Sequence, residues 1–339
     1  MRAAVLRNGR MIERDDVTEP VPGPGQVLVG VKACGICGSD LHFAKYGPDV
    51  LELNNQIDGF GGSGGMQIDL NHDIFMGHEF SAEVLEAGPD TDAPAPGTLV
   101  TSLPVLVSST GFEPIVYSNK TIGGYAERML LSAPLLTPIP NGLDPRHAAL
   151  TEPMAVGLHA VNKSAIERGE TALVLGCGPI GIAIIAGLRR RGVETIVAAD
   201  YSARRRELAD TMGATTTVDP ANASPFDDTS PRVVFEAVGV PGIIDDILRR
   251  APVGARVVVA GVCMQPDTFH PYFAIAKQIN LQFVLAYDGA EFTDCLRAIA
   301  EGDIDVAPMI TGEVGLDGVG AAFDDLAHPD VHCKILVTP

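Results

Sequence analysis

The segment LVLGCGPIG, residues 173–181, has the pattern of an apolar strand, a G-x-G-x-x-G turn and the first residues of a helix. Gly176 permits the tight turn, Gly178 allows a pyrophosphate to approach the backbone, and Gly181 allows the helix to pack closely on the strand. The start of the helix then offers free N–H groups to phosphates. A glycine-rich structural turn is the alternative. We expect dinucleotide contacts from Gly176, Gly178, Pro179, Ile180 and Gly181.

A carboxylate follows at the end of the next expected strand. Asp200 lies 24 residues beyond Gly176, where a carboxylate can bind both ribose hydroxyls and repel a 2′-phosphate. This charge predicts NAD(H) rather than NADP(H). The arginines at 204–206 weaken that preference, because an arginine can accommodate the extra phosphate. Arg205 is the candidate for a cofactor contact, although at least two of the three arginines are expected on a solvated helix face.

Around this segment, apolar strands alternate with helical patterns from about residue 154 to residue 290. Strands are expected at 171–175, 195–199, 232–236, 256–260 and 281–285, and helices at 179–191, 203–212 and 242–250. This alternation is typical of an α/β protein with a doubly wound parallel sheet of the Rossmann type. One more helix, at 291–301, and a final strand, at 334–337, are expected beyond it.

The first 150 residues are dense in Gly and Pro, with short β-type runs such as 26–32 and 79–87 and no long helical period. That composition predicts a compact, mostly β unit. Within it, residues 51–74 are polar and contain GFGGSGG at 59–65, so we expect a loop there. A chain of 339 residues is long enough for two such domains.

Charge and cysteine content exclude several classes of function. Acidic residues outnumber basic ones by 43 to 24, and the formal charge of −19 disfavours nucleic acids and anionic membranes as partners. The chain has no apolar run of membrane-spanning length and no signal-peptide pattern at its start. Six widely spread cysteines do not resemble a secreted disulfide framework. A cytoplasmic protein with free thiols is expected.

Three separated motifs offer metal ligands. CGICGSDLH at 34–42 contains a C-x-x-C, GHEF at 77–80 contains a histidine followed by a carboxylate, and a further carboxylate stands at Glu152. A catalytic zinc takes three protein ligands of N, S and O type and keeps one position open. From the residues alone, Cys37, His78 and Glu152 could also be ordinary core and loop residues.

Together these motifs resemble the zinc-dependent medium-chain alcohol dehydrogenases, and more closely the sorbitol, threonine and secondary-alcohol branch. The matching stretches are CGICGSDLH at 34–42, GHEF at 77–80, GGYAE at 123–127, EPMAVGLHAV at 152–161, LGCGPIG at 175–181, FEAVG at 235–239 and KILV at 334–337. The resemblance implies a GroES-like, mostly β catalytic domain formed by residues 1–153 and 291–339. A Rossmann NAD-binding domain, 154–290, is inserted into it, with the active site in the cleft between the two.

The resemblance also implies a ligand set for one catalytic zinc. Cys37 and His78 match two ligands, and Glu152 takes the place of a third, which is Cys or a carboxylate in relatives. Glu79 matches a residue that in relatives either contacts the zinc ligands without binding the metal or alternates with one of them as a ligand. Two coordinated carboxylates would over-neutralise the zinc, so Glu152 ranks first and Glu79 is the exchange partner. Asp40 is expected to orient the ligands through hydrogen bonds.

The implied reaction interconverts a secondary or polyol-like alcohol and its ketone or aldehyde, with hydride passing from a zinc-bound alkoxide to NAD. Ser39 and His42 match a proton relay that runs through the cofactor ribose to solvent. For His42 a solvated surface histidine is the alternative. Lys334 matches a basic residue that reaches the pyrophosphate, and a surface lysine is the alternative there. The family implies a homodimer or a homotetramer.

Zinc-free members of the superfamily act as quinone or enoyl reductases, and an inactive NAD-binding regulatory protein is a further alternative. The joint presence of Cys37, His78 and Glu152 argues against both alternatives.

Two features depart from the family pattern. No cysteine or histidine lies between His78 and His147, where many relatives carry a structural zinc. We therefore expect one zinc per chain, with apolar residues such as Leu106, Phe112 and Ile115 packing that segment instead. The interval from Cys37 to His78 is 41 residues, longer than usual because of residues 51–74. A substrate lid and a disordered surface insertion both remain open for this stretch.

Overall fold

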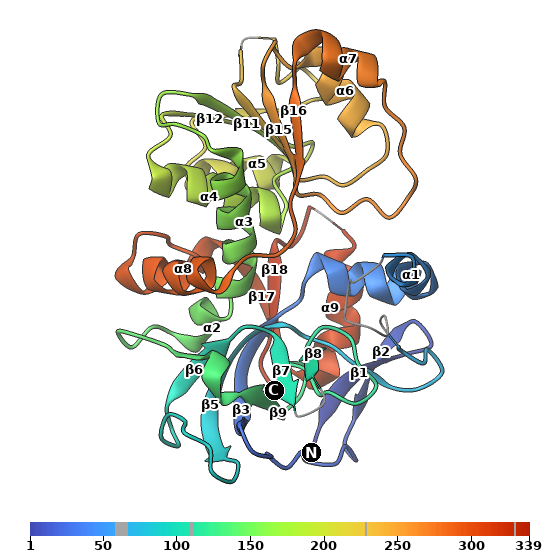
Figure 1. Cartoon of the computed structure of the whole chain (residues 1–339), viewed down its shortest axis with the longest axis vertical. Coiled ribbons are helices and arrows are strands. Elements are labelled where there is room, and N and C mark those ends of the chain that lie inside the picture. The colour runs from blue at the N-terminus through green and yellow to red at the C-terminus, as the bar shows by residue number, and fades with distance from the viewer. Residues whose placement is uncertain (58–66, 109–110, 228, 329) are drawn as a thin grey trace. The chain divides into compact units, whose positions relative to one another are not determined.

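The structure is a computed structural model and describes residues 1–57, 67–108, 111–227, 229–328 and 330–339. The chain, drawn in Figure 1, divides into two compact units. The first unit holds Met1–Glu152, Ile310–His328 and Lys334–Pro339, and the second holds Pro153–Met309 and Pro329–Cys333. In the described part of the chain, no helix combines the length and the apolarity that crossing a membrane requires.

The first unit is mostly β, as its sequence predicts. Its described strands form a seven-stranded sheet in the order β10-β6-β5-β3-β18-β17, with β9 also paired to β3, a three-stranded sheet β2-β1-β4, and a hairpin β7-β8. The bounds are β1 Ala3–Arg7, β2 Arg10–Arg14, β3 Gln26–Gly35, β4 Ile74–Phe75, β5 Glu79–Ala87, β6 Leu99–Ser102, β7 Val105–Ser108, β8 Gly111–Pro114, β9 Arg128–Ser132, β10 Leu136–Pro138, β17 Ile310–Val314 and β18 Lys334–Val337. The short helices α2, Pro145–Ala148, and α9, Val319–Leu326, complete it.

Helix α1, Gly38–Asn55, contradicts the prediction that this region has no long helix. It also takes up residues 51–55 of the expected loop, whereas 58–66 lie outside the described residues. A kink at Tyr46 and the helix-breaking Pro48 obscure the helical period in the sequence. The helix is held by tertiary contacts instead, because Phe43 is buried in the core of the first unit.

The segment expected to replace a structural zinc lobe contains the hairpin of β7 and β8. Val107 pairs with Phe112 across the hairpin. Leu106 and Ile115 are buried, as expected, but the Phe112 side chain is 77 % exposed. The prediction that Phe112 packs this segment is therefore wrong, because its position on the short hairpin directs the ring to solvent.

The second unit confirms the doubly wound fold. Its described strands form a parallel six-stranded sheet in the order β13-β12-β11-β14-β15-β16. The strands are β11 Thr171–Leu175, β12 Thr195–Ala199, β13 Thr216–Val218, β14 Val233–Glu236, β15 Arg256–Val259 and β16 Asn280–Phe283. The helices are α3 Thr151–Ser164, which begins in the first unit, α4 Pro179–Arg191, α5 Ala203–Thr211, α6 Ile243–Arg250, α7 Pro271–Lys277 and α8 Gly289–Glu301. Three of these elements, α3, β13 and α7, were not predicted from the sequence.

Helix α8 belongs to the second unit, whereas the resemblance predicts residues from 291 onward in the catalytic domain. Two polar contacts hold it there. Nδ1 of His159 on α3 lies 2.7 Å from Oε2 of Glu291, and Arg190 on α4 donates to Asp294, with 3.0 Å between Nη2 and Oδ1. The second unit therefore extends to Met309.

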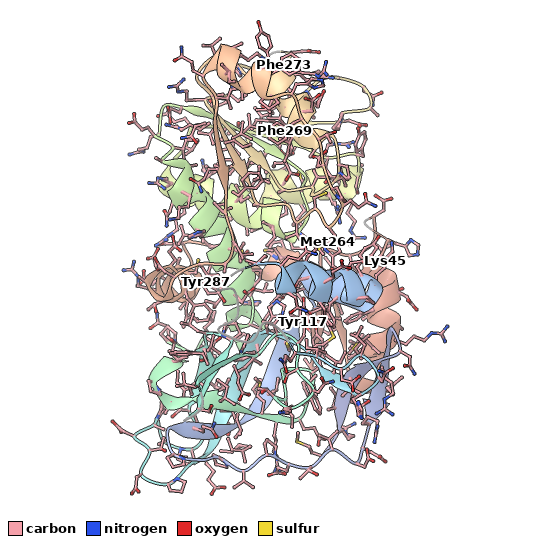
Figure 2. The ribbon with its side chains drawn as sticks, turned by 45° about the vertical axis from the view of Figure 1, so that its right-hand side comes forward. Lys45, Tyr117, Met264, Phe269, Phe273 and Tyr287 are labelled. Atoms are coloured by element: carbon pink, nitrogen blue, oxygen red, sulfur yellow. The ribbon has the colours of Figure 1, made fainter. Side chains whose placement is uncertain are left out.

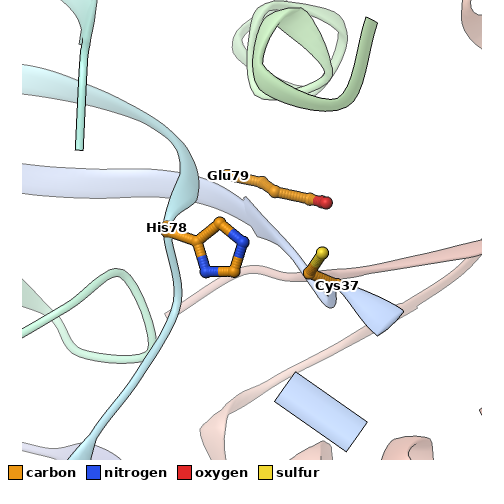
Figure 3. Close-up of side chains that lie close together, drawn as sticks. All are labelled: Cys37, His78 and Glu79. Atoms are coloured by element: carbon orange, nitrogen blue, oxygen red, sulfur yellow. The ribbon is translucent and has the colours of Figure 1, made fainter. Parts of the chain in front are cut away.

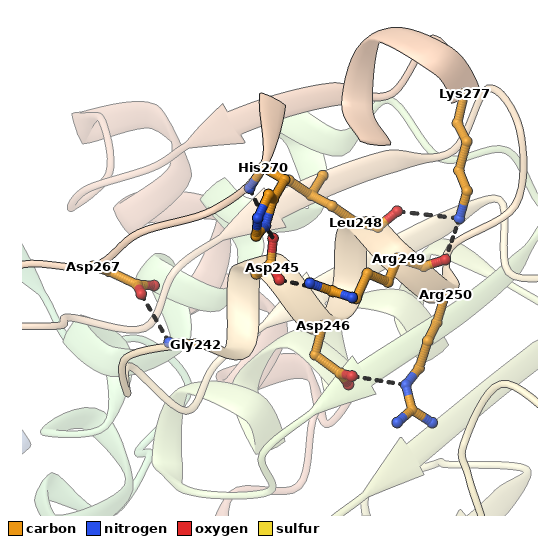
Figure 4. Close-up of polar contacts among 9 residues, drawn as sticks. All are labelled: Gly242, Asp245, Asp246, Leu248, Arg249, Arg250, Asp267, His270 and Lys277. Carbon is orange, nitrogen blue, oxygen red and sulfur yellow. Dashed lines mark hydrogen bonds and ion pairs between the residues drawn. The ribbon is translucent and has the colours of Figure 1, made fainter. Parts of the chain in front are cut away.

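Polar contacts also fix both ends of α6, as Figure 4 shows. Asp245 in its first turn accepts a hydrogen bond from Arg249 at 2.8 Å and lies 2.9 Å from Nδ1 of His270. At the other end, Lys277 donates to the free carbonyl groups of Leu248 at 3.1 Å and Ala251 at 2.9 Å. Acidic residues at the start and basic groups at the end of a helix both complement its dipole.

Candidate metal centre and dinucleotide site

The first candidate ligand stands at the junction of β3 and α1. Cys37 is the N-cap residue of α1, and its backbone N–H donates to Oδ2 of Asp40 at 3.0 Å. The Cys37 side chain is partly exposed, unlike that of the buried Cys34. Burial raises the pKa of the Cys34 thiol well above its usual value, which disfavours the thiolate that binds a metal. Local structure therefore prepares Cys37, and not Cys34, to bind a metal.

His78 and Glu79 enter the same place from the start of β5. The preceding Gly77 has a φ of +98°, and a Cβ there would lie 2.8 Å from the backbone nitrogen of Tyr125. Only glycine fits this tight approach. One ligand atom from each of Cys37, His78 and Glu79 lies within 4.8 Å of the others (Figure 3). In the described residues this is the single group of three such side chains.

The charges around His78 favour a cation at this position. Burial alone would lower the pKa of His78, but the negative charges of Asp40, Cys37 and Glu152 outweigh it and raise that pKa well above its usual value. The imidazole also makes a side-chain hydrogen bond with Cys37. A thiol, an imidazole and carboxylates that together attract positive charge form a donor set that fits zinc.

Asp40 supports this group from the interior. Its buried carboxylate accepts the hydrogen bond from Cys37 N–H and one from the Tyr125 hydroxyl at 2.6 Å, and its Oδ1 lies 3.5 Å from Nδ1 of His78. Burial raises the pKa of Asp40, while the nearby His78 and Tyr125 oppose the rise. Tyr125 lies in the motif GGYAE at 123–127, and the motif alone predicts no role for its hydroxyl.

Glu79 is already paired with a buried lysine. Nζ of Lys334 lies 2.7 Å from both carboxylate oxygens of Glu79 and donates to the Ile36 carbonyl at 3.0 Å. A Cβ on Gly35 would lie 2.0 Å from Oε2 of Glu79, so glycine is required there. Lys334 is thus buried and not a surface lysine, which corrects that alternative. The salt bridge reduces the charge that Glu79 could offer a metal.

Glu152 stands apart from the group of three. It lies in the first turn of α3, and its carboxylate is close enough to raise the pKa of His78. The structure therefore brings Cys37, His78 and Glu79 together and leaves Glu152 as a nearby carboxylate.

The two expected relay residues lie on α1, after Cys37. Ser39 shares a side-chain hydrogen bond with Tyr117, a residue that no sequence motif indicates. His42 is half-buried, and burial together with the charge of Lys45 lowers its pKa below the usual value. His42 is therefore a half-buried imidazole that is neutral near pH 7 rather than a freely solvated histidine.

The glycine-rich turn of the second unit has the local structure that its sequence predicts. Gly176 has a φ of +90°, and a Cβ on Gly181 would lie 1.8 Å from the Gly176 carbonyl oxygen. Gly178 is the N-cap residue of α4, and the nearest atom to a Cβ built there is an Arg205 nitrogen at 4.0 Å. The turn thus leaves open space beside the start of a helix, which suits a phosphate.

Asp200 follows β12 and is held by the backbone. Its carboxylate accepts hydrogen bonds from the N–H groups of Cys177 at 2.8 Å and Ser202 at 2.9 Å. Arg205 lies 3.8 Å from the same carboxylate, and Arg206 donates to the Asp200 carbonyl at 2.7 Å. Arg204 alone of the three arginines is exposed. The expectation that at least two face solvent is therefore wrong.

Two family models match these units. The alcohol dehydrogenase GroES-like domain matches residues 23–141, and the zinc-binding dehydrogenase domain matches residues 179–301. The chain belongs to the zinc-dependent medium-chain alcohol dehydrogenases. The dehydrogenase is 29 % identical to an (R,R)-butanediol dehydrogenase of Bacillus subtilis over the full length of both chains. It is 24 % identical to a sorbitol dehydrogenase of the same species, covering 100 % of this chain and 97 % of the relative.

Solved structures agree with this assignment. The crystal structure of 2R,3R-butanediol dehydrogenase from Bacillus subtilis superposes on the dehydrogenase with a TM-score of 0.83 and 28 % identity, covering 100 % of this chain and 99 % of the other. A protein from Sinorhizobium meliloti 1021, described as a zinc-binding dehydrogenase and bound to NADP, gives a TM-score of 0.82 at 28 % identity with the same coverage. The dehydrogenase is accordingly an alcohol oxidoreductase that uses zinc and a nicotinamide cofactor.

Proposed function

We propose that the dehydrogenase interconverts a secondary or polyol-like alcohol and its ketone, with NAD(H) as the hydride carrier. The observation that carries this proposal is the group of Cys37, His78 and Glu79, with Ser39 two residues beyond Cys37 in the first turn of α1. A zinc-dependent alcohol dehydrogenase needs both the metal ligands and a hydroxyl that can accept the substrate proton. Relatives named for butanediol and sorbitol support the substrate class.

Cys37, His78 and Glu152 would hold one zinc, with Glu79 as an exchange partner. Zinc bound there would act as a Lewis acid that lowers the pKa of the alcohol hydroxyl. Glu152 ranks ahead of Glu79 because Lys334 already neutralises Glu79 in the interior. Asp40 would keep the His78 ring oriented, since its carboxylate is itself fixed by Tyr125 and the Cys37 backbone.

The chain supplies its own groups for the released proton. Ser39 would accept the hydroxyl proton from the substrate, and His42 would be the base that takes it up next. The lowered pKa of His42 keeps its imidazole neutral and able to accept that proton.

NAD(H) is proposed over NADP(H) on the geometry of Asp200. Two backbone hydrogen bonds fix its carboxylate at the end of β12, where a 2′-phosphate would meet its charge. Arg205, 3.8 Å away, is partly neutralised by that carboxylate and is proposed to contact the dinucleotide near Gly178.

We further propose a homodimer that forms through the edge of the second sheet. Strand β16 ends the sheet order, and the side chains of Ile275, Phe283 and Leu285 around it are 73 %, 60 % and 65 % exposed. An apolar sheet edge of this kind is favourable to cover with another chain. A Leu285→Asp and Phe283→Asp double variant should sediment as a monomer, and an unchanged mass would contradict this interface.

The six free cysteines agree with a reducing compartment.

A substrate screen tests the proposed function. Purified protein loaded with zinc is assayed by NADH absorbance against 2,3-butanediol stereoisomers, sorbitol and primary alcohols, before and after removal of zinc with a chelator. We expect turnover of a secondary or polyol substrate that disappears on chelation and returns with zinc. Full activity of the metal-free protein, or activity confined to primary alcohols, would contradict the proposal.

A further inference from the structure

Tyr117 contacts the catalytic side of α1 at two points. Its ring stacks on Phe43 with 4.0 Å between ring centroids and 14° between ring planes. Its hydroxyl shares a hydrogen bond with the Ser39 side chain. Ser39 and Phe43 are four residues apart, so they lie on one face of the helix. Figure 2 shows Tyr117 next to this helix. The phenol therefore lies along the helix face that presents Ser39.

Residues 118 and 119, which follow Tyr117, are held by hydrogen bonds to the segment 69–75. Ser118 exchanges two backbone hydrogen bonds with Phe75, at 2.8 and 3.1 Å. The Asn119 side chain accepts from the Asp69 N–H at 2.7 Å and donates to the carbonyls of Asp69 at 3.0 Å and Asp73 at 2.9 Å. We name these contacts of Asn119 the Asn119 clamp. All its partners lie in 69–73, the second arm of the long interval between Cys37 and His78.

We infer that Tyr117 is a positioning residue for the Ser39 hydroxyl and that the segment 69–75 serves to hold Tyr117 in place through the Asn119 clamp. This inference rests on the proposed function of Ser39 as the first proton acceptor. A free serine hydroxyl rotates between three staggered positions. The hydrogen bond shared with Tyr117 fixes one of these positions and leaves a lone pair of Ser39 able to accept the substrate proton. The long interval thereby acquires a role distinct from both a lid and an idle insertion.

The Tyr117→Phe variant removes the hydroxyl and keeps the ring that stacks on Phe43. We expect kcat for alcohol oxidation to fall by about 10- to 100-fold, with zinc content and the KM for NAD unchanged. The solvent deuterium isotope effect on kcat should increase, because proton transfer to a poorly oriented Ser39 becomes slower than hydride transfer. Tyr272→Phe, on an exposed tyrosine of α7, is the matched control and should change neither quantity. A lower kcat with an unchanged isotope effect would assign Tyr117 a structural role only.

The clamp is tested by combining two variants. Asn119→Ala should lower kcat several-fold, and adding it to Tyr117→Phe should cause little further loss, because both changes act on the same hydroxyl. Asn222→Ala, which removes a comparable hydrogen bond to Asp219 at 2.9 Å in the second unit, is the control. If the fall in kcat of the double variant equals the product of the falls in the two single variants, the role of the Asn119 clamp is overturned.

A readout without turnover separates this inference from the proposed function. The chain has six tyrosines, so fluorotyrosine labelling gives few 19F resonances, and the Tyr117→Phe variant identifies the one from Tyr117. Ser39→Ala and Asn119→Ala should both move that resonance, whereas Asn222→Ala should leave it unchanged. If the 19F chemical shift of Tyr117 does not change in Ser39→Ala, the inference is overturned, whatever the activity of the variant. If these chemical shifts change as expected but the protein oxidises no alcohol, the inference stands and the proposed function is overturned.

Discussion

At the scale of single residues, Cys37 bears most directly on the chemistry. Replacing its thiol with the hydroxyl of Cys37→Ser leaves the hydrogen bond from its backbone to Asp40 intact, so the fold should survive. A neutral hydroxyl is a poor ligand for zinc, and we expect loss of the metal and a fall in kcat of more than about a hundredfold. Metal analysis and kcat check this, with Cys263→Ser in the second unit as the control. Retention of both zinc and rate would exclude Cys37 as a ligand.

Asp200 makes a prediction about the cofactor. Asp200→Gly removes the charge that would repel a 2′-phosphate and leaves Arg205 nearby, so the ratio of kcat/KM for NADP to that for NAD should rise about tenfold, equivalent to about 1.4 kcal/mol. The ratio is the right measure because Asp200 also binds the backbone of Cys177 and Ser202, and its loss weakens both cofactors. Asp200→Asn, which keeps an acceptor, separates charge from hydrogen bonding. A wild type that prefers NADP would contradict our interpretation of Asp200.

The pKa of His42 should determine how kcat for alcohol oxidation falls at acid pH. Burial, followed by the charge of Lys45, holds its pKa below 6.5. A base works only when it is deprotonated, so kcat for alcohol oxidation should decline only as the pH falls below that value. Lys45→Gln removes a positive charge, which raises the pKa of His42 and should move the acid limb to higher pH. Lys163→Gln, at the end of α3, is the control and should leave the limb unmoved.

At the scale of elements, α8 is joined to α4 by an ion pair. The hydrogen bond from Arg190 lowers the pKa of Asp294 to about 2. A carboxyl group with a lowered folded-state pKa contributes stability above its unfolded value, near 3.8, and loses it as the pH falls towards 2. Asp294→Ala should therefore lower the free energy of unfolding by about 1 kcal/mol at pH 7. Denaturant titrations at pH 7 and near pH 2.5, between the folded and unfolded pKa values, should show the difference shrinking, and equal differences would contradict this role.

Some helices and strands could be predicted from the sequence and others could not, because burial leaves a pattern in only some of them. Strands such as β11 and β12 are apolar because both faces of a parallel sheet are buried, and the predicted bounds of both were correct. Helix α1 has no such signature, since Gly47 and Pro48 interrupt it and packing of Phe43 stabilises it. Tyr117 could not be predicted at all. Its contact with Ser39 joins positions 78 residues apart, and only the folded chain brings them together.

At the scale of the whole molecule, the expected metal content follows from the first unit. The stretch from 79 to 146 contains neither cysteine nor histidine, and in the described residues only Cys37, His78 and Glu79 form a group able to hold a metal. A tetrahedral structural zinc needs four such ligands close together. The hairpin of β7 and β8 is instead stabilised by buried apolar side chains, including Leu106.

We therefore expect one zinc per chain, bound at the catalytic site. A chelator should abolish activity before it unfolds the protein, because the packing of the first unit does not depend on the metal. Elemental analysis of chelator-rinsed, fully active protein gives the count, and Cys37→Ser prepared in parallel should contain close to none. A reproducible value near two per chain, or unfolding that coincides with loss of zinc, would mean that a second metal stabilises the fold.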